Sequence, residues 1–187
     1  HKMKNKGLLP NLSNHLGKLS RTNSEALTGA MMPDTTIDFS AGCAITSSFF
    51  PDENTHIEPV RYGKGSNLMG LLQTIMTDGA SAKLRRKHWL KQFISKPLLI
   101  SKILNVRKWS ERTVIALTMQ NVDSSISVYG KRSIFGWRLT SNNDATNPNA
   151  TYIPAANEVV KRIANKNNGI TGGHIGDLIN APFTAHF

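Results

Sequence analysis

The chain has 187 residues, of which 39% are hydrophobic and 19% are charged, a balance typical of a folded protein and not of a disordered one. Its 23 lysines and arginines outnumber 12 acidic residues, and a net charge of +11 indicates nucleic acid, an anionic membrane surface, an acidic partner, or acidic surface elsewhere in a longer protein. No run of about 18 apolar residues exists, which excludes a transmembrane helix, and the single cysteine excludes an internal disulfide.

The first half of the chain alternates short apolar runs with turn residues. Residues 1–30 are rich in Asn, Ser, Gly and Lys and predict loop with a short helix. Strands are predicted over 41–50 and 55–62, and the first of them is expected to bury Cys43. A helix is predicted over 66–76, since Ser66 can cap its first turn.

The second half begins with a basic helical segment over 81–109, which Pro97 divides. Three strands follow over 112–120, 125–129 and 133–140, with turns at 122–123 and 130–131. After a polar loop, a helix begins at Pro154 and ends near Gly169, and the tail from residue 172 has a loop composition. Strands therefore cluster in blocks separated by helices, which predicts an α+β fold with a mainly antiparallel sheet flanked by helices.

Several common functional motifs are missing from the sequence. It contains no Gly-x-Gly-x-x-Gly after a predicted strand, no phosphate-binding loop ending in Gly-Lys-Ser/Thr and no His-Glu-x-x-His. The six histidines are scattered, and no two of them are spaced four residues apart. We therefore predict no phosphate cradle and no metal site in this chain.

Four segments, in order along the chain, resemble the middle and late parts of bacterial glucose-methanol-choline oxidoreductases, close to their cholesterol oxidase-like branch. They are GLLPNLS at 7–13 followed by Leu-Gly at 16–17, RTNSE at 21–25, THIEPVRYGKGS at 55–66, and APFTAHF at 181–187. The resemblance implies an FAD-dependent enzyme acting on the CH–OH group of a sterol or similar apolar alcohol. It also implies bacterial-type localisation, cytoplasmic or membrane-associated.

Enzymes of this family have a flavin-binding part and a substrate-binding part, and the chain resembles the second. We expect one substrate-binding domain over 1–187, truncated at both ends, with the flavin-binding domain absent. The basic start of the chain lacks the apolar core of a signal peptide, so no export signal is predicted within it. The fragment alone is expected to hold no FAD, to be inactive, and to need the missing flavin-binding portion as its partner.

The resemblance places the proton chemistry on His186. Removing hydride from an alcohol leaves a carbonyl, so the hydroxyl proton must pass to a nearby base, and an imidazole titrates near neutral pH. The alternative is a loop histidine without a role.

Two further site residues follow from the resemblance. A strand carboxylate is implicated in moving the double bond in steroid-oxidising relatives, and Glu58 aligns with it; the alternative is an exposed strand glutamate. The amide of Asn23 is placed near the flavin ring, which it can hydrogen-bond. The alternative there is a helix N-cap at Asn23 or Ser24.

The basic segment 81–109 allows two interpretations. A solvated helix face is the simpler one, whereas Trp89, Phe93 and Trp109 beside many cations are typical of an anchor at a membrane surface. The competing hypothesis for the whole chain is a basic module without chemistry that binds nucleic acid or a membrane surface. Because no nucleic-acid motif and no aromatic stacking platform is present, we expect no nucleic-acid partner.

Overall fold

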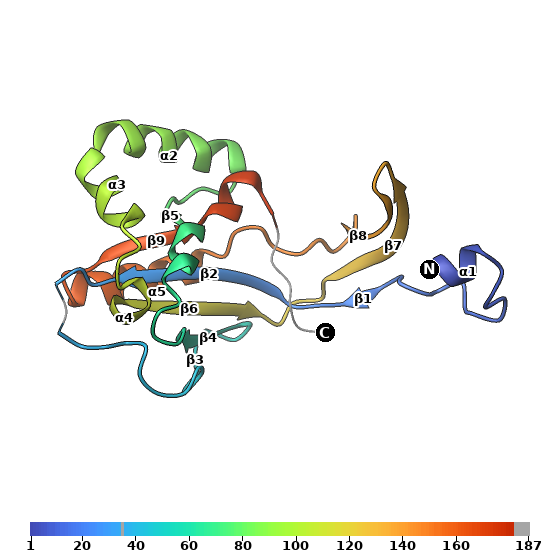
Figure 1. The fold of residues 1–187 in the computed structure, drawn as a ribbon, viewed down its shortest axis with the longest axis horizontal. Coiled ribbons are helices and arrows are strands. Elements are labelled where there is room, and N and C mark those ends of the chain that lie inside the picture. Colours follow the sequence, from blue (N-terminus) through green and yellow to red (C-terminus); the bar gives the residue numbers. More distant parts are fainter. Residues whose placement is uncertain (35, 182–187) are drawn as a thin grey trace.

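A six-stranded antiparallel sheet forms the centre of the fold in the computed structural model, which describes residues 1–34 and 36–181 (Figure 1). Its strand order is β3-β4-β6-β2-β9-β5. The strands are β2 (Ser24–Met31), β3 (Phe49–Asp52), β4 (Thr55–Val60), β5 (Gln73–Ile75), β6 (Thr113–Gln120) and β9 (Ile170–His174). The long central pair, β2 and β6, is in register from Ser24 opposite Gln120 to Met31 opposite Thr113.

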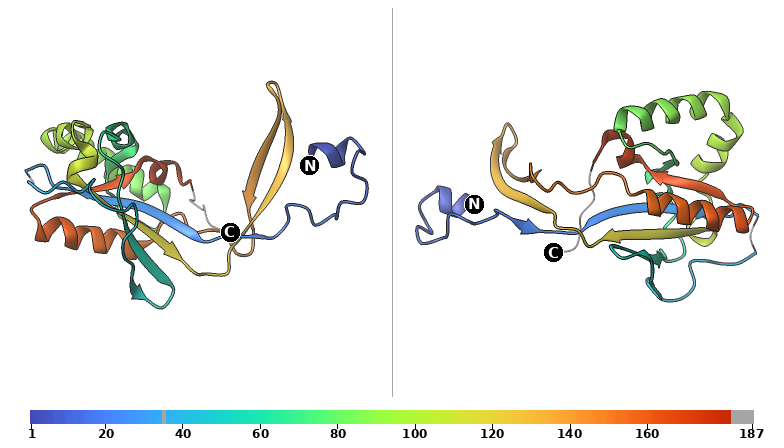
Figure 2. Two further views of the ribbon diagram at one scale, coloured as in Figure 1. Left: turned by 60° about the horizontal axis from the view of Figure 1, so that its bottom comes forward. Right: turned by 180° about the vertical axis from the view of Figure 1, so that it is seen from behind.

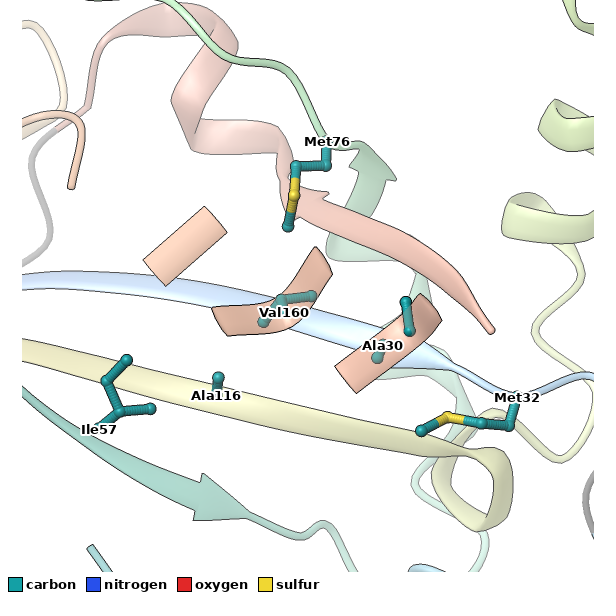
Figure 3. Packing of buried hydrophobic residues seen from close by; sticks show 7 residues of the cluster. Ala30, Met32, Ile57, Met76, Ala116 and Val160 are labelled. Atoms are coloured by element: carbon teal, nitrogen blue, oxygen red, sulfur yellow. The ribbon is translucent and has the colours of Figure 1, made fainter. Parts of the chain in front are cut away.

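One face of this sheet is covered by helix α5 (Pro154–Lys166), which lies in front of the strands in the reverse view of Figure 2. Proline fits the first turn of the helix, where no backbone N–H is needed. Val160 of α5 is fully buried and packs with Ala30 of β2 and Ala116 of β6 (Figure 3). Since side chains alternate across a strand, the intervening residues of β2 and β6 face the other side of the sheet.

Helices α2 (Ala82–Ser95) and α3 (Pro97–Leu104) form a layer beside the β5 edge (Figure 1). Ser81 caps α2 by accepting a hydrogen bond from the backbone of Leu84, at 3.3 Å. The remaining helical segments are short: α1 (Lys2–Asn5), α4 (Trp109–Arg112), and the 3-10 helices η1 (Asn67–Leu72) and η2 (Ile175–Ile179). No helix of the described residues is both long and apolar enough to cross a bilayer.

Arg85 of α2 attaches this layer to the rest of the fold. Its side chain is fully buried and donates three hydrogen bonds, to the carbonyl oxygens of Gly79 (2.8 Å) and Asp177 (3.2 Å) and to Asn180 Oδ1 (2.9 Å). Its guanidinium also lies 5.3 Å from the centre of the Tyr152 ring. A buried cation with this many acceptors holds α2 against η2.

A second sheet projects from the main body, as both views in Figure 2 show. It pairs β1 (Ser20–Arg21) with the long hairpin of β7 (Ser125–Ser133) and β8 (Gly136–Asn143). Ile134 and Phe135 at the hairpin tip are 92% and 95% exposed. The chain passes three times between the sheets, and there Asn149 donates to Thr22 Oγ1 (2.9 Å) and to the carbonyl of Asn23 (2.8 Å).

The structure confirms the α+β class and the antiparallel arrangement. The predicted strands at 55–62 and 112–120, the helices divided at Pro97 and the helix beginning at Pro154 are present as β4, β6, α2 with α3, and α5. The prediction of a turn at 130–131 is wrong, because β7 continues to Ser133.

Other local predictions are also wrong. Residues 24–30 were predicted within a loop region but lie in the central strand β2, and residues 172–174 of the tail predicted as loop lie in β9. The helix predicted over 66–76 is a 3-10 helix followed by strand β5. Of the strand predicted over 41–50, only Phe49 and Phe50 belong to β3, and Cys43 is exposed.

Candidate functional site

The sheet face opposite α5 carries an open apolar pocket, with about 490 Å³ of space that includes solvent at its mouth. Leu27 and Gly29 of β2 and Thr113 and Ile115 of β6 lie in its floor. The walls come from η1, β5, α4 and the chain after β4. They are formed by Tyr62, Met69, Leu72, Gln73 and Trp109.

Two glycines create the hollow in this floor. Gly29 of β2 lies opposite Gly172 of β9 in the antiparallel register, so neither strand has a side chain at that point. A Cβ atom on Gly172 would overlap the Gln73 amide, and one on Gly29 would lie 3.5 Å from Thr113 Cγ2. Glycine is needed at Gly172 because the Gln73 amide already occupies the space above that strand.

Trp109 closes the pocket on the side of η1. The indole is 5% exposed, and its ring lies so close to Gly70 that a Cβ there would be 2.8 Å from it. Its Nε1 donates a hydrogen bond to Gln73 Oε1. Because an indole N–H can only donate, the Gln73 oxygen must face Trp109 and the amide nitrogen must point away.

Glu58 lies on the same sheet face as the pocket. In the register of the sheet it is opposite Leu117 of β6, which is opposite Leu27 of β2. Its Oε1 lies 3.1 Å from Nε2 of His56, which has the same orientation two residues earlier in β4. The Glu58 side chain is 21% exposed and paired with His56, so it is less exposed than the alternative of an exposed strand glutamate expects.

Asn23 lies at the start of β2, and its amide nitrogen donates to Glu25 Oε1 at 2.9 Å. By strand alternation Glu25 faces the side of Leu27 and the pocket. The alternative role of Asn23 or Ser24 as a helix N-cap is wrong, because a strand and not a helix begins here. His186 lies outside the described residues. The structure thus brings Glu58 and the Asn23–Glu25 pair to one sheet face.

His174 and Asp177 form a pocket-edge pair that the sequence analysis missed. His174 lines the pocket, and its Nδ1 accepts a hydrogen bond from the backbone N–H of Gly176 at 2.9 Å, so a neutral ring carries its proton on Nε2. The Asp177 carboxylate accepts from the His174 backbone at 3.3 Å. Burial lowers the pKa of His174 and raises the pKa of Asp177 to about 6. The residues surrounding this pair have a loop-like composition, so only the strand pairing reveals it.

The described residues contain no group of three or more His, Cys, Asp or Glu side chains placed to hold a metal ion. The anchor interpretation of 81–109 needs a correction, because Trp109 is buried beneath η1. Trp89 is also partly covered, stacked on Phe93 and donating to Thr74 Oγ1 at 2.8 Å. The apolar side chains that α2 and α3 expose are Leu84, Leu90, Phe93, Ile94, Leu98 and Leu104.

Comparison with known proteins bears on this geometry. The whole chain aligns over 195 residues, at 50% identity, with a cholesterol oxidase of Mycobacterium tuberculosis strain H37Rv. A cholesterol oxidase of Acinetobacter baumannii aligns with 99% of the chain at 37% identity. The chain is homologous to cholesterol oxidases. It spans about a third of their length, 33% and 34% respectively.

This homology to cholesterol oxidases confirms the resemblance stated from the four sequence segments. No protein-family profile matches the chain, and no solved structure is significantly similar to it. The roles of Glu58, Asn23 and His186 stay predictions. The homology runs through all described residues of the pocket, because it covers the full chain.

Proposed function

We propose that this chain forms the substrate-binding part of an FAD-dependent oxidoreductase that oxidises the CH–OH group of a sterol. One observation carries the proposal. In a chain homologous over its full length to cholesterol oxidases, the sheet face opposite α5 holds an apolar pocket and also carries the Glu58 carboxylate and the Asn23–Glu25 pair. Leu27, Ile115, Met69 and Leu72 give a large apolar molecule the contact area that drives its binding from water.

The candidate site residues suit the proton movements of such a reaction. The hydroxyl proton would pass to His186, and Asn23 at the start of β2 would orient the groups at this end of the sheet. Glu58 would take a proton from one ring carbon and return it to another, which moves the double bond. His56, 3.1 Å from the carboxylate, would hold Glu58 in place.

The residues of this chain fit one wall of a flavin site and not a complete one. FAD requires a glycine-rich loop whose backbone N–H groups meet the pyrophosphate at a helix N-terminus, and the sequence contains no such motif after a strand. FAD, when bound, would accept the hydride of the alcohol. The pocket face would cover the reacting groups and exclude water from them.

The proposal is tested in the full-length protein with FAD bound, by substitution at the pocket wall. Leu72→Trp places a large ring in the pocket, whereas Leu71→Trp changes the neighbouring side chain, which does not line it. We expect the KM for a sterol to rise about tenfold or more in the first variant, a loss of about 1.4 kcal/mol in binding. The second variant should match wild type. Equal KM values in both variants, or no oxidation of any sterol by wild type, would overturn the proposal.

A further inference from the structure

Two buried polar side chains face the pocket without a hydrogen-bond partner among the described residues. Gln73 is 8% exposed and Thr113 is 3% exposed, and neither Gln73 Nε2 nor Thr113 Oγ1 has a partner. Leaving such groups unpaired is costly, so they usually meet a ligand, a water molecule or another protein group. Both line the pocket whose other walls are mainly apolar.

The hydrogen bond from Trp109 fixes what Gln73 offers to the pocket. Since the indole can only donate, it holds the amide oxygen and leaves the NH2 group as a free donor. The amide lies over Gly172, and the Thr113 methyl group lies near the position of a Cβ on Gly29. These two glycines are opposite each other, so the Gln73 donor and the Thr113 side chain flank the same hollow.

We propose that Gln73 and Thr113 form a polar subsite over the Gly29–Gly172 pair that binds an acceptor oxygen at the far end of an apolar ligand. The inference rests on the proposed function and specifies its substrate class, a hydroxysteroid that carries a second oxygen, as a ketone, remote from the reacting alcohol. A ketone oxygen has two lone pairs and accepts from both side chains at once.

The dimensions of the sheet support two separate ends. Glu58 in β4 and Gly172 in β9 are three strand spacings of about 4.8 Å apart and two residues of about 3.4 Å along the strands, which places them about 16 Å apart. This distance is comparable with the length of a four-ring steroid plus the lengths of two hydrogen bonds, one at each end of the molecule. A ligand that reaches from Glu58 therefore brings its far ring to Gln73.

The test uses the full-length flavin-loaded protein and a matched pair of steroids. Dehydroepiandrosterone has a ketone on the ring remote from its hydroxyl group, and androst-5-en-3β-ol is identical except that it lacks this oxygen. KM from turnover and Kd from equilibrium binding are measured for both. Thr113→Val removes the hydroxyl at constant shape, and Gln73→Met removes the amide. Thr118→Val is the control, because Thr118 Oγ1 is equally buried and unpaired but faces α5.

We expect each subsite variant to weaken binding of the ketone relative to its deoxygenated analogue by about fivefold to tenfold, as for one lost hydrogen bond. Thr118→Val should leave the ratio unchanged. In wild type, without any substitution, the carbonyl stretching frequency of bound dehydroepiandrosterone should be lower than that of the free steroid. Oxidation of both steroids with an unchanged ratio in the variants and no shift would overturn the subsite alone. If wild type neither binds nor oxidises either steroid, the proposed function fails as well.

Discussion

Replacing Arg85 by methionine should detach the α2–α3 layer from the main sheet. The side chain donates three hydrogen bonds, and hydrogen bonds from a charged group contribute about 1.5–3 kcal/mol each. They are not additive, and Asn180 Oδ1 keeps a second donor in Thr151 Oγ1 at 2.9 Å. The methionine retains part of the apolar contact with Tyr152. We therefore expect a loss of about 3–4 kcal/mol in unfolding free energy.

The assay is hydrogen exchange with peptide-level readout in the full-length protein, because the loss should be local before it is global. Amides of α2 and of η2 should exchange about 150- to 900-fold faster, which corresponds to the same loss of about 3–4 kcal/mol in protection. Arg86→Met is the matched control, since Arg86 is exposed and makes one long hydrogen bond of 3.4 Å to Leu178 O. Unchanged exchange in both segments of the Arg85 variant would refute the view that this cation holds the layer.

Three further outcomes are expected. Burial raises the pKa of Asp177 from 3.8 to about 6, so its ionisation should lower the free energy of unfolding by at most about 3 kcal/mol as the pH rises from about 4 to 6. Asp177→Asn should flatten this part of a profile of unfolding free energy against pH. The same slope in the variant and in wild type would contradict this prediction. The exposed cations of α2 and α3 should bind anionic vesicles in a cosedimentation assay, each cation near the surface contributing about 1 kcal/mol, and salt should weaken this binding. Equal binding to neutral vesicles would reject the membrane-anchor interpretation. Salt-dependent DNA binding without vesicle binding would favour the nucleic-acid alternative. In the complete enzyme, His186→Ala should slow flavin reduction in stopped flow by about 10²–10⁴-fold with little change in substrate affinity, whereas a normal rate in a variant with full flavin content would remove His186 from the mechanism.

The sequence predicted elements where one local signal dominates. Pro154 and the apolar spacing of Val159, Val160 and Ile163 mark α5, and a continuous apolar run over 114–117 between threonines marks β6. The central strand β2 was not predicted because residues 1–30 are rich in Asn, Ser, Gly and Lys, and only pairing with β6 and β9 makes 24–31 a strand. β5 has three residues and follows a helix-like run, so its pairing with β9 cannot be predicted from local pattern.

The residues of the candidate site also divide into those that local sequence signals predict and those that depend on the fold. Glu58 and Asn23 were found through family motifs, and the structure places Glu58 and the Asn23–Glu25 pair on one sheet face. Gln73, Thr113 and His174 were missed, because each is unremarkable in its own segment. What distinguishes them is their place in the pocket lining near the Gly29–Gly172 pair, and that arises only when residues far apart in the chain meet.

The bond between Trp109 and Gln73 also gives the protein a built-in optical reporter. The chain has three tryptophans, and they occupy three different environments. Trp109 is buried at the pocket, Trp89 is stacked on Phe93 in the basic helix, and Trp137 is 39% exposed in the projecting hairpin. With Trp89 and Trp137 replaced by phenylalanine, the remaining emission would follow ligand entry directly. With Trp109 and Trp137 replaced instead, the emission of Trp89 would follow vesicle contact. Ligand entry and vesicle contact can therefore be timed separately in one protein.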